Sequence, residues 1–260
     1  MSDRRGKFET FAYGKDPAAQ GDLYLPERDR PAVVCLLHGG FWRMPYGRDQ
    51  LAAHAVDLAR RGYAAWNLGY RRLGVAGAGW PGTFDDVSAG IDFLRSLQTR
   101  GITLDLDRVA VIGHSAGGHL ALWAAGQQAQ RRRQALDCRV AIAAVCALAP
   151  VADLELACAL GLSDNVTERL LGGLPANVPH VYAQASPIRL LPFGIPQLVV
   201  HGEMDDVVPI GMTRNYVQRA GQSGDHVDAA LLPSSGHFEH LDAQSEPWAI
   251  VTAWLDRVMG

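Results

Sequence analysis

Hydrophobic residues along the chain fall into two alternating patterns. Short apolar runs are typical of strands, and they occur at residues 8–13, 21–25, 32–37, 63–68, 108–113, 139–148, 197–200 and 226–232. Segments with apolar residues every three or four positions are typical of helices, and they cover residues 47–61, 84–99, 116–126, 210–220 and 247–258. This alternation predicts an α/β protein with a mostly parallel, eight-stranded sheet flanked by helices.

Two parts of the chain depart from the alternation. The first two runs are joined through Asp16-Pro17, which predicts a hairpin at one edge of the sheet. Segment 151–195 holds only short helical pieces separated by prolines, which predicts a small helical cap inserted after a strand. No internal repeat or linker divides the chain, so we expect residues 1–260 to form one domain.

Local signals also mark two helix ends. Thr83 precedes the helical segment 84–99, whose first turn is acidic, so we expect Thr83 to cap that helix. The basic run 131–133 follows the helical segment 116–126, and we expect it to be a solvated connector.

Composition narrows the class of protein. The hydrophobic and charged fractions, 48% and 20%, are ordinary for a soluble globular protein. The net charge is −3, which gives no reason to expect a nucleic acid or an anionic membrane as partner. The longest apolar run, 140–152, is shorter than the roughly 20 residues that a membrane helix needs. Residues 1–14 lack the apolar core of a signal peptide, so we expect a cytoplasmic protein.

Metal-binding signals are missing from the sequence. No CxxC, HxH or HExxH spacing occurs among the cysteines and histidines, so we expect neither a metal nor another cofactor. The four cysteines do not suggest a zinc site, and we expect those in apolar strands to be small buried hydrophobic residues; the four are Cys35, Cys138, Cys146 and Cys158. The sequence leaves open whether the chain forms a homodimer.

A G-x-S-x-G motif lies where the run 108–113 meets the helical segment 116–126. A serine at such a corner is strained, with its hydroxyl pushed outward, and its neighbours must be small because strand and helix nearly collide. Ser115 is therefore the candidate nucleophile, and the Ala116 amide at the helix start is a candidate oxyanion donor. Glycine-rich turns are also common without catalysis, so the motif needs partners elsewhere in the chain.

A second glycine pair follows the central run 32–37. His38-Gly39-Gly40-Phe41-Trp42 can aim backbone amides into a pocket, and Gly40 or Phe41 would supply the second oxyanion donor. The alternative is a plain turn between a strand and a helix. We expect His38 to form structural hydrogen bonds at the strand end rather than to act as a base.

A serine hydroxyl needs a neutral imidazole as base, and that imidazole needs a carboxylate to orient it. Asp205 and His237 follow the last two predicted strands, where their side chains can reach the same sheet edge as Ser115. Asp206 competes with Asp205, but the spacing within H-G-x-x-D-x-x-V-P favours Asp205. His240 competes with His237 but falls closer to the final helix.

Aromatic residues near these motifs are candidates for a substrate pocket. We expect Trp42, Trp80 and His114 to contact substrate, although the tryptophans could equally belong to the core. His114 occupies the variable position before the serine, where it can also brace the turn.

Taken together, four motifs resemble the α/β-hydrolase superfamily. They are Gly113-His114-Ser115-Ala116-Gly117-Gly118, His38-Gly39-Gly40-Phe41-Trp42, H-G-x-x-D-x-x-V-P at 201–209, and Ser235-Gly236-His237-Phe238. Within that superfamily the chain is similar to small serine esterases of the HGG type and to kynurenine formamidases. One departure concerns the third glycine of the HGGG esterases, which is Phe41 here, so the second oxyanion donor stays open between Gly40 and Phe41.

The resemblance implies an acyl-enzyme mechanism with Ser115 as nucleophile, Asp205 as orienting carboxylate and His237 as base. The expected activity is hydrolysis of small carboxylic esters, with a small acyl compound as substrate and a homodimer left open. Alternatives are an arylformamidase, a transacylase with the same triad, and a non-catalytic protein that binds a ligand in the same pocket.

Overall fold

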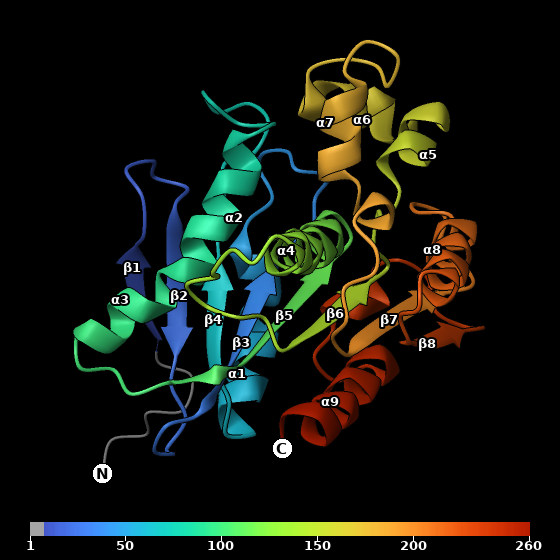
Figure 1. Ribbon diagram of the computed structural model, residues 1–260. Helices are drawn as coiled ribbons and strands as arrows, with labels where there is room; N and C mark the ends of the chain where they lie inside the picture. The colour runs from blue at the N-terminus through green and yellow to red at the C-terminus, as the bar shows by residue number, and fades with distance from the viewer. Residues whose placement is uncertain (1–7) are drawn as a thin grey trace.

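The computed structural model describes residues 8–260, within which eight strands form one sheet in the order β1-β2-β4-β3-β5-β6-β7-β8 (Figure 1). The strands are β1 (Phe8–Ala12), β2 (Gln20–Tyr24), β3 (Ala32–Leu37), β4 (Ala64–Leu68), β5 (Asp105–His114), β6 (Ala144–Leu148), β7 (Gln197–Gly202) and β8 (Val227–Leu232). β1 and β2 form the predicted antiparallel hairpin at one edge, and β2 pairs antiparallel with β4. All pairings from β4 to β8 are parallel. The predicted fold class is confirmed.

Helices cover both faces of this sheet. The longer helices are α1 (Ala52–Arg60), α2 (Gly82–Asp92), α4 (Ala116–Arg133), α8 (Ile210–Gln222) and α9 (Glu246–Met259). Shorter helices are α3 (Leu94–Thr99), α5 (Leu154–Ala159), α6 (Leu162–Leu171) and α7 (Pro179–Ala185), with 3-10 turns η1 (Arg48–Leu51), η2 (Pro187–Arg189) and η3 (Glu239–Leu241). α2, α4 and α8 contribute to one buried cluster, and α1 and α9 contribute to the other.

Strand β5 shows why two separate cores form. Val109 and Val111 belong to the cluster under α4, whereas Ala110 and Ile112 belong to the cluster under α1 and α9. Successive side chains of a strand point to opposite faces, so an unbroken apolar run fills both cores. Because β5 is buried on both faces, its carboxyl end holds the residues that follow it in a fixed position.

The segment between β6 and β7 forms the expected group of short helices. α5, α6 and α7 lie together beyond the carboxyl end of the sheet (Figure 1). The amide of Trp80 donates to the Leu170 carbonyl of α6 at 2.7 Å, and Arg43 donates to the Ser163 carbonyl. These contacts hold the helical insertion against loops that follow β3 and β4.

Helix α4 also anchors the return from this insertion. His119 Nε2 lies 3.0 Å from the Ala185 carbonyl oxygen. Near the end of the helix, Arg132 donates to the Phe193 carbonyl at 2.9 Å and Arg133 donates to the Pro192 carbonyl at 2.6 Å. The chain segment that leads from α7 to β7 is therefore bound along the side of α4.

Two local predictions were wrong. Thr83 lies inside α2 rather than before it, and its hydroxyl donates to the Arg71 carbonyl at 2.7 Å. The basic run 131–133 is the last turn of α4, not a connector, because its guanidinium groups bind carbonyls of neighbouring loops. Tertiary hydrogen bonds thus extend the helix beyond its apolar part.

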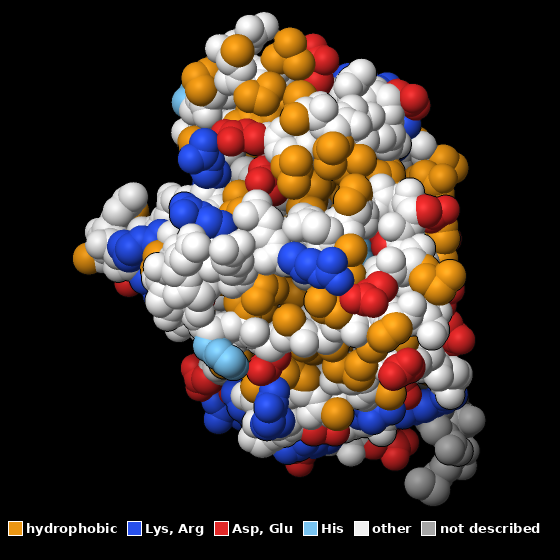
Figure 2. All heavy atoms as spheres, turned by 90° about the vertical axis from the view of Figure 1, so that its right-hand side faces the viewer, with side chains coloured by type: hydrophobic (Ala, Val, Ile, Leu, Met, Phe, Trp, Pro, Cys, Tyr) orange, Lys and Arg blue, Asp and Glu red, His pale blue; other side chains and the backbone are white. Residues whose placement is uncertain are grey.

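The opposite edge of the sheet ends in β8. A shallow hollow lies over this strand and α9, lined by Leu198, Asp228, Ala229, Ala230, Ile250, Ala253, Trp254 and Arg257. Figure 2 faces this side of the molecule and shows hydrophobic side chains interspersed with charged ones. No helix within residues 8–260 is long and apolar enough to cross a membrane. The N-terminal stretch expected to lack a signal peptide begins with residues 1–7, which lie outside the described part.

Candidate active site

Ser115 stands at the corner between β5 and α4 in a strained backbone conformation, with φ 56° and ψ −117°. The corner is so tight that a Cβ atom on Gly113 would lie 2.0 Å from the Gly117 carbonyl oxygen. A Cβ atom on Gly117 would lie 2.0 Å from the Leu37 carbonyl oxygen at the end of β3. Only glycine fits these two positions, and the close packing maintains the strained conformation of the serine.

The loop after β3 lies directly against this corner. A Cβ atom on Gly39 would lie 3.3 Å from the Cβ of Ser115. Gly40 and Phe41 both have positive φ values, 99° and 48°, so the backbone curls tightly beside the serine. Ala116 is the first residue of α4, where the amide has no acceptor within the helix. The arrangement brings backbone N–H groups from two segments close to the nucleophile, as an oxyanion hole requires.

The structure accounts for one backbone amide of this loop. The Gly39 N–H donates to Oε1 of Gln50 at 3.1 Å, so that amide is already engaged. Gly40 and Phe41 remain the two candidates for the second donor, as predicted. Gln50 was assigned no function from the sequence, because nothing in the sequence places its side chain beside the loop.

Asp205 and His237 meet at the carboxyl ends of β7 and β8. Oδ2 of Asp205 lies 2.7 Å from Nδ1 of His237, and Oδ1 accepts the amides of Val207 and Val208 at 2.8 Å. Both side chains are almost completely buried. The competing Asp206 is exposed and makes no such contact. The geometry therefore favours Asp205 as the partner of this imidazole.

The carboxylate of Asp205 is held in its ionised form. Burial alone would raise its pKa, but hydrogen bonds from His201, His237 and the Val208 amide hold the pKa well below its usual range. A permanently charged carboxylate fixes the proton of His237 on Nδ1. The other ring nitrogen, Nε2, is then left as the proton acceptor.

His114, the residue directly before Ser115, contacts His237. Its Nε2 lies 3.0 Å from the His237 carbonyl oxygen, and the two rings are 4.8 Å apart. Because a carbonyl only accepts, Nε2 of His114 carries the proton. Burial lowers the pKa of His114 well below its ordinary value, so the ring is neutral. The side chain of His114 thus holds the backbone of His237 close to the corner that carries Ser115.

The three residues predicted to contact substrate have different environments. Trp42 is fully buried in the core, and its Nε1 donates to Nδ1 of His119 at 3.2 Å, which favours the alternative that it is a core residue. His114 is only 3% exposed and braces the loop of His237. Trp80 is half-buried between α2 and α6 and packs edge-on against Phe84. Of the three, Trp80 alone retains appreciable exposed surface.

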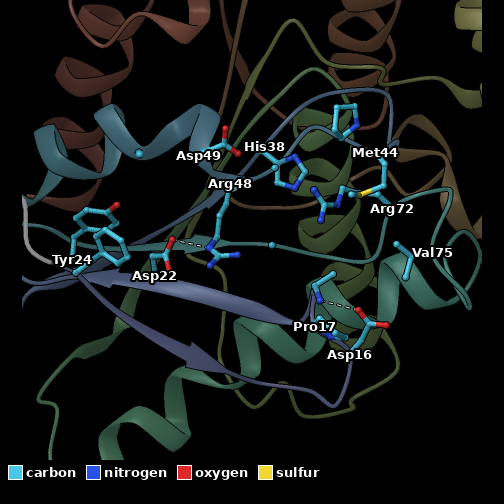
Figure 3. Close-up of a pocket in the computed structure, with 16 residues that line it drawn as sticks. Asp16, Pro17, Asp22, Tyr24, His38, Met44, Arg48, Asp49, Arg72 and Val75 are labelled. Atoms are coloured by element: carbon cyan, nitrogen blue, oxygen red, sulfur yellow. Dashed lines mark hydrogen bonds and ion pairs between the residues drawn. The ribbon is translucent and has the colours of Figure 1, made fainter.

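A cavity of about 660 Å³ lies elsewhere, between the β1–β2 hairpin and the loop after β3 (Figure 3). Its walls include Arg48, Arg72 and His38 but none of the three proposed catalytic residues. His38 stacks on Tyr70 at 4.2 Å, and the Tyr70 hydroxyl donates to the His38 carbonyl at 2.7 Å. These contacts agree with the predicted structural role of His38.

A second histidine contacts Asp205. Nε2 of His201 lies 3.0 Å from Oδ2 of the carboxylate, a contact that the sequence interpretation did not assign. The four-residue spacing in H-G-x-x-D was the available signal. No group of three or more His, Cys, Asp or Glu side chains among the described residues is arranged to hold a metal ion.

Solved structures with the same fold include several esterases. A truncated carbohydrate esterase from gut microbiota has a TM-score of 0.81 and 21% identity, covering 100% of this chain and 98% of that one. Est2, a thermophilic esterase from Thermogutta terrifontis, has a TM-score of 0.77 and 19% identity, covering 98% of this chain and 94% of that one. At these identities the similarity establishes the α/β-hydrolase-like fold.

Sequence comparisons identify the family. Esterase LipC of Mycobacterium tuberculosis is 28% identical over an alignment of 263 residues that includes 95% of this chain. The chain spans 64% of the length of that relative. The model of the BD-FAE family matches residues 22–219, more than half of the chain. With the fold and the Asp205–His237 pair, this match shows that the chain belongs to the BD-FAE family of α/β hydrolases.

Proposed function

We propose that the protein is a serine carboxylesterase that hydrolyses esters of short acyl groups through an acyl-enzyme. One observation carries this proposal: the buried Asp205–His237 pair, 2.7 Å apart, is joined through the His237 carbonyl to His114, the residue directly before the strained Ser115. A carboxylate, an imidazole and a strained serine in this order are the components of serine hydrolysis.

In the proposed first step, Ser115 Oγ attacks the ester carbonyl while its proton passes to Nε2 of His237. The carbonyl oxygen becomes an oxyanion, which accepts hydrogen bonds from the N–H of Ala116 and from the N–H of Gly40 or Phe41. The C–O bond to the alcohol then breaks, and the alcohol leaves with the proton from His237. A water molecule deprotonated by His237 attacks the acyl-enzyme, and the acid is released as Ser115 regains its proton.

The names of related proteins support esters with short acyl groups. The relative from M. tuberculosis is named an esterase. Structures of T. terrifontis Est2 contain bound propionate and bound butyrate, and another is phosphorylated by paraoxon. Those statements concern the relatives, and they guide the choice of substrates for this chain.

The test uses Ser115→Ala and a series of p-nitrophenyl esters from acetate to octanoate. We expect the wild type to prefer the short esters and to be labelled by a fluorophosphonate. Ser115→Ala should remain folded, lose labelling and lose about 10⁴-fold or more in kcat. N-formylkynurenine serves as the formamide substrate in the same assay. Full activity of Ser115→Ala, or a formamide preference, would contradict the proposal.

A further inference from the structure

His201 binds the oxygen of Asp205 that also binds the base. Nε2 of His201 and Nδ1 of His237 lie 3.0 Å and 2.7 Å from Oδ2 of the carboxylate. The other oxygen accepts the amides of Val207 and Val208, both at 2.8 Å. Four donors occupy the lone pairs of one carboxylate. One oxygen of Asp205 therefore serves two imidazole rings at once.

The surroundings fix the proton of His201. Its Nε2 also lies 3.0 Å from the Val208 carbonyl oxygen, so both neighbours of this nitrogen are acceptors and the nitrogen must carry a proton. Its Nδ1 lies 2.7 Å from Oγ1 of Thr213 in α8. His201 and Thr213 are both fully buried. The ring thus connects Thr213 to Asp205 in a single fixed orientation.

We propose that His201 is a positioning residue for the hydrolysis, acting through Asp205 on His237, with Thr213 holding the His201 ring in place. The proposal rests on the proposed function. The bond from His201 prevents the carboxylate from rotating away from His237, and so keeps the His237 ring in the orientation that its Nδ1 contact with Asp205 fixes. It also shares the negative charge of Oδ2 between two donors.

This sharing of charge predicts a measurable effect on His237. Without the His201 donor, Oδ2 interacts more strongly with His237 and stabilises its protonated form. The other histidines near the pair are His114 and His240, which burial keeps neutral by lowering their pKa values, that of His240 to about 4. Loss of the donor should therefore shift the acidic limb of the kcat/KM–pH profile to higher pH.

The experiment compares His201→Phe, which keeps a ring but removes the donor, with His201→Gln, whose amide can still donate to Asp205. In metal sites, mutating the hydrogen-bond partner behind an imidazole ligand lowers affinity or activity by about 10–100-fold. By analogy, we expect His201→Phe to lower kcat by a similar factor with KM little changed. The midpoint of the acidic limb of kcat/KM for His201→Phe should shift upward by about half a pH unit or more. His201→Gln should restore most of the lost kcat.

Two further variants complete the comparison. Thr213→Val removes the donor to Nδ1 and should produce the same changes at smaller size, so it also carries the test if His201→Phe does not fold. His226→Gln replaces an exposed histidine and should match the wild type. Circular dichroism and the urea midpoint report whether each variant is folded.

Wild-type kcat and an unmoved acidic limb in folded His201→Phe would overturn the proposal. Equal losses in His201→Phe and His201→Gln with the limb unmoved would also overturn it, because they indicate packing alone. The pKa of the His237 ring, followed by NMR in ¹⁵N-histidine-labelled protein without substrate, separates the two proposals. If the wild type hydrolyses no ester, the proposed function fails, whereas the NMR comparison still tests the effect of His201 on His237.

Discussion

Ser115 and Phe41 both have positive φ values, a conformation that costs a residue with a side chain about 1–3 kcal/mol. Ser115 lies where backbones of β3, β5 and α4 approach closely, and glycines at 113 and 117 make that approach sterically feasible. The surrounding core therefore supplies the energy that keeps the serine and its neighbouring amides in place. The proposed chemistry depends on this backbone geometry as much as on the three side chains.

At the same scale, the pairing of Asp205 with His237 predicts an asymmetry between two adjacent aspartates. Asp205→Asn replaces an acceptor with an amide, allows the wrong tautomer of His237, and should lower kcat by about 10⁴-fold. Asp206→Asn should leave kcat unchanged, because Asp206 is exposed and does not contact the imidazole. Steady-state kinetics on a short p-nitrophenyl ester decides the matter. Equal losses in the two variants would contradict the assigned geometry.

Motif spacing was enough to predict which side chains meet, but it was not enough to predict every environment. Asp205 and His237 follow strands whose ends must lie at one sheet edge, so their pairing could be predicted. The sequence left Trp42 open between pocket and core, because an aromatic residue after two glycines suits both equally well, and the structure buries it in the core. Gln50 and His201 contact the site through distances that only the folded chain defines.

At the scale of elements, apolar periodicity predicted strands and helices well but misplaced several ends. β6 begins at Ala144, later than predicted, and α4 continues to Arg133, beyond its apolar part. The longer α4 is supported by contacts outside the helix, such as the bond from Arg132 to the Phe193 carbonyl. Sequence periodicity reports burial, whereas element ends depend also on hydrogen bonds that neighbouring loops supply.

The contact between the loop after β4 and α6 gives a prediction for this scale. Gly79 has φ 84°, and a Cβ atom there would lie 2.8 Å from the Leu170 carbonyl oxygen. Gly172 has a similar φ of 82° but open space around it. Gly172→Ala should therefore lose about 1 kcal/mol of unfolding free energy from backbone strain alone.

Gly79→Ala should lose about 1–3 kcal/mol more than Gly172→Ala, because it also pushes α6 away from the loop. Urea unfolding of both variants measures the difference. Similar losses would show that the insertion moves freely relative to the loop.

At the scale of the whole molecule, the parallel sheet gathers side chains that are far apart in the chain. The parallel order β3-β5-β6-β7-β8 places the carboxyl ends of β3, β5, β7 and β8 on the same side of the sheet. The sequence predicted a mostly parallel sheet with an edge hairpin, but not the order of its strands. Strand order depends on long-range packing. Because the apolar runs resemble one another, their sequences do not show which runs become neighbouring strands.

Buried histidines predict how the stability of the whole fold responds to acid. Burial lowers the pKa of His38 to about 3 and those of His54, His119 and His240 to about 4. In the unfolded chain a histidine binds its proton near pH 6.5. Below that pH the unfolded state holds more protons, so the unfolding free energy should fall steadily from pH 6.5 towards pH 4.

His54→Phe should reduce this loss between pH 7 and pH 5 by about 1–2 kcal/mol, because it removes one of the buried titrating groups. The ring of His54 packs edge-on against Trp248 at 4.5 Å, and phenylalanine keeps that ring. Urea unfolding at several pH values provides the measurement. His180→Gln, at an exposed position, should leave the slope as in the wild type. An unchanged slope in His54→Phe would show that His54 is protonated in the native state.

Helix α4 begins directly after the nucleophile and binds the segment 185–193 along its side. Both ends of the helical insertion are thereby tied to the rigid core, one through β6 and the other through α4. We therefore expect that residues between these anchor points can be exchanged for those of a relative without moving the corner that carries Ser115. Under the proposed function, the sequence of the insertion can diversify while the site of bond cleavage stays intact.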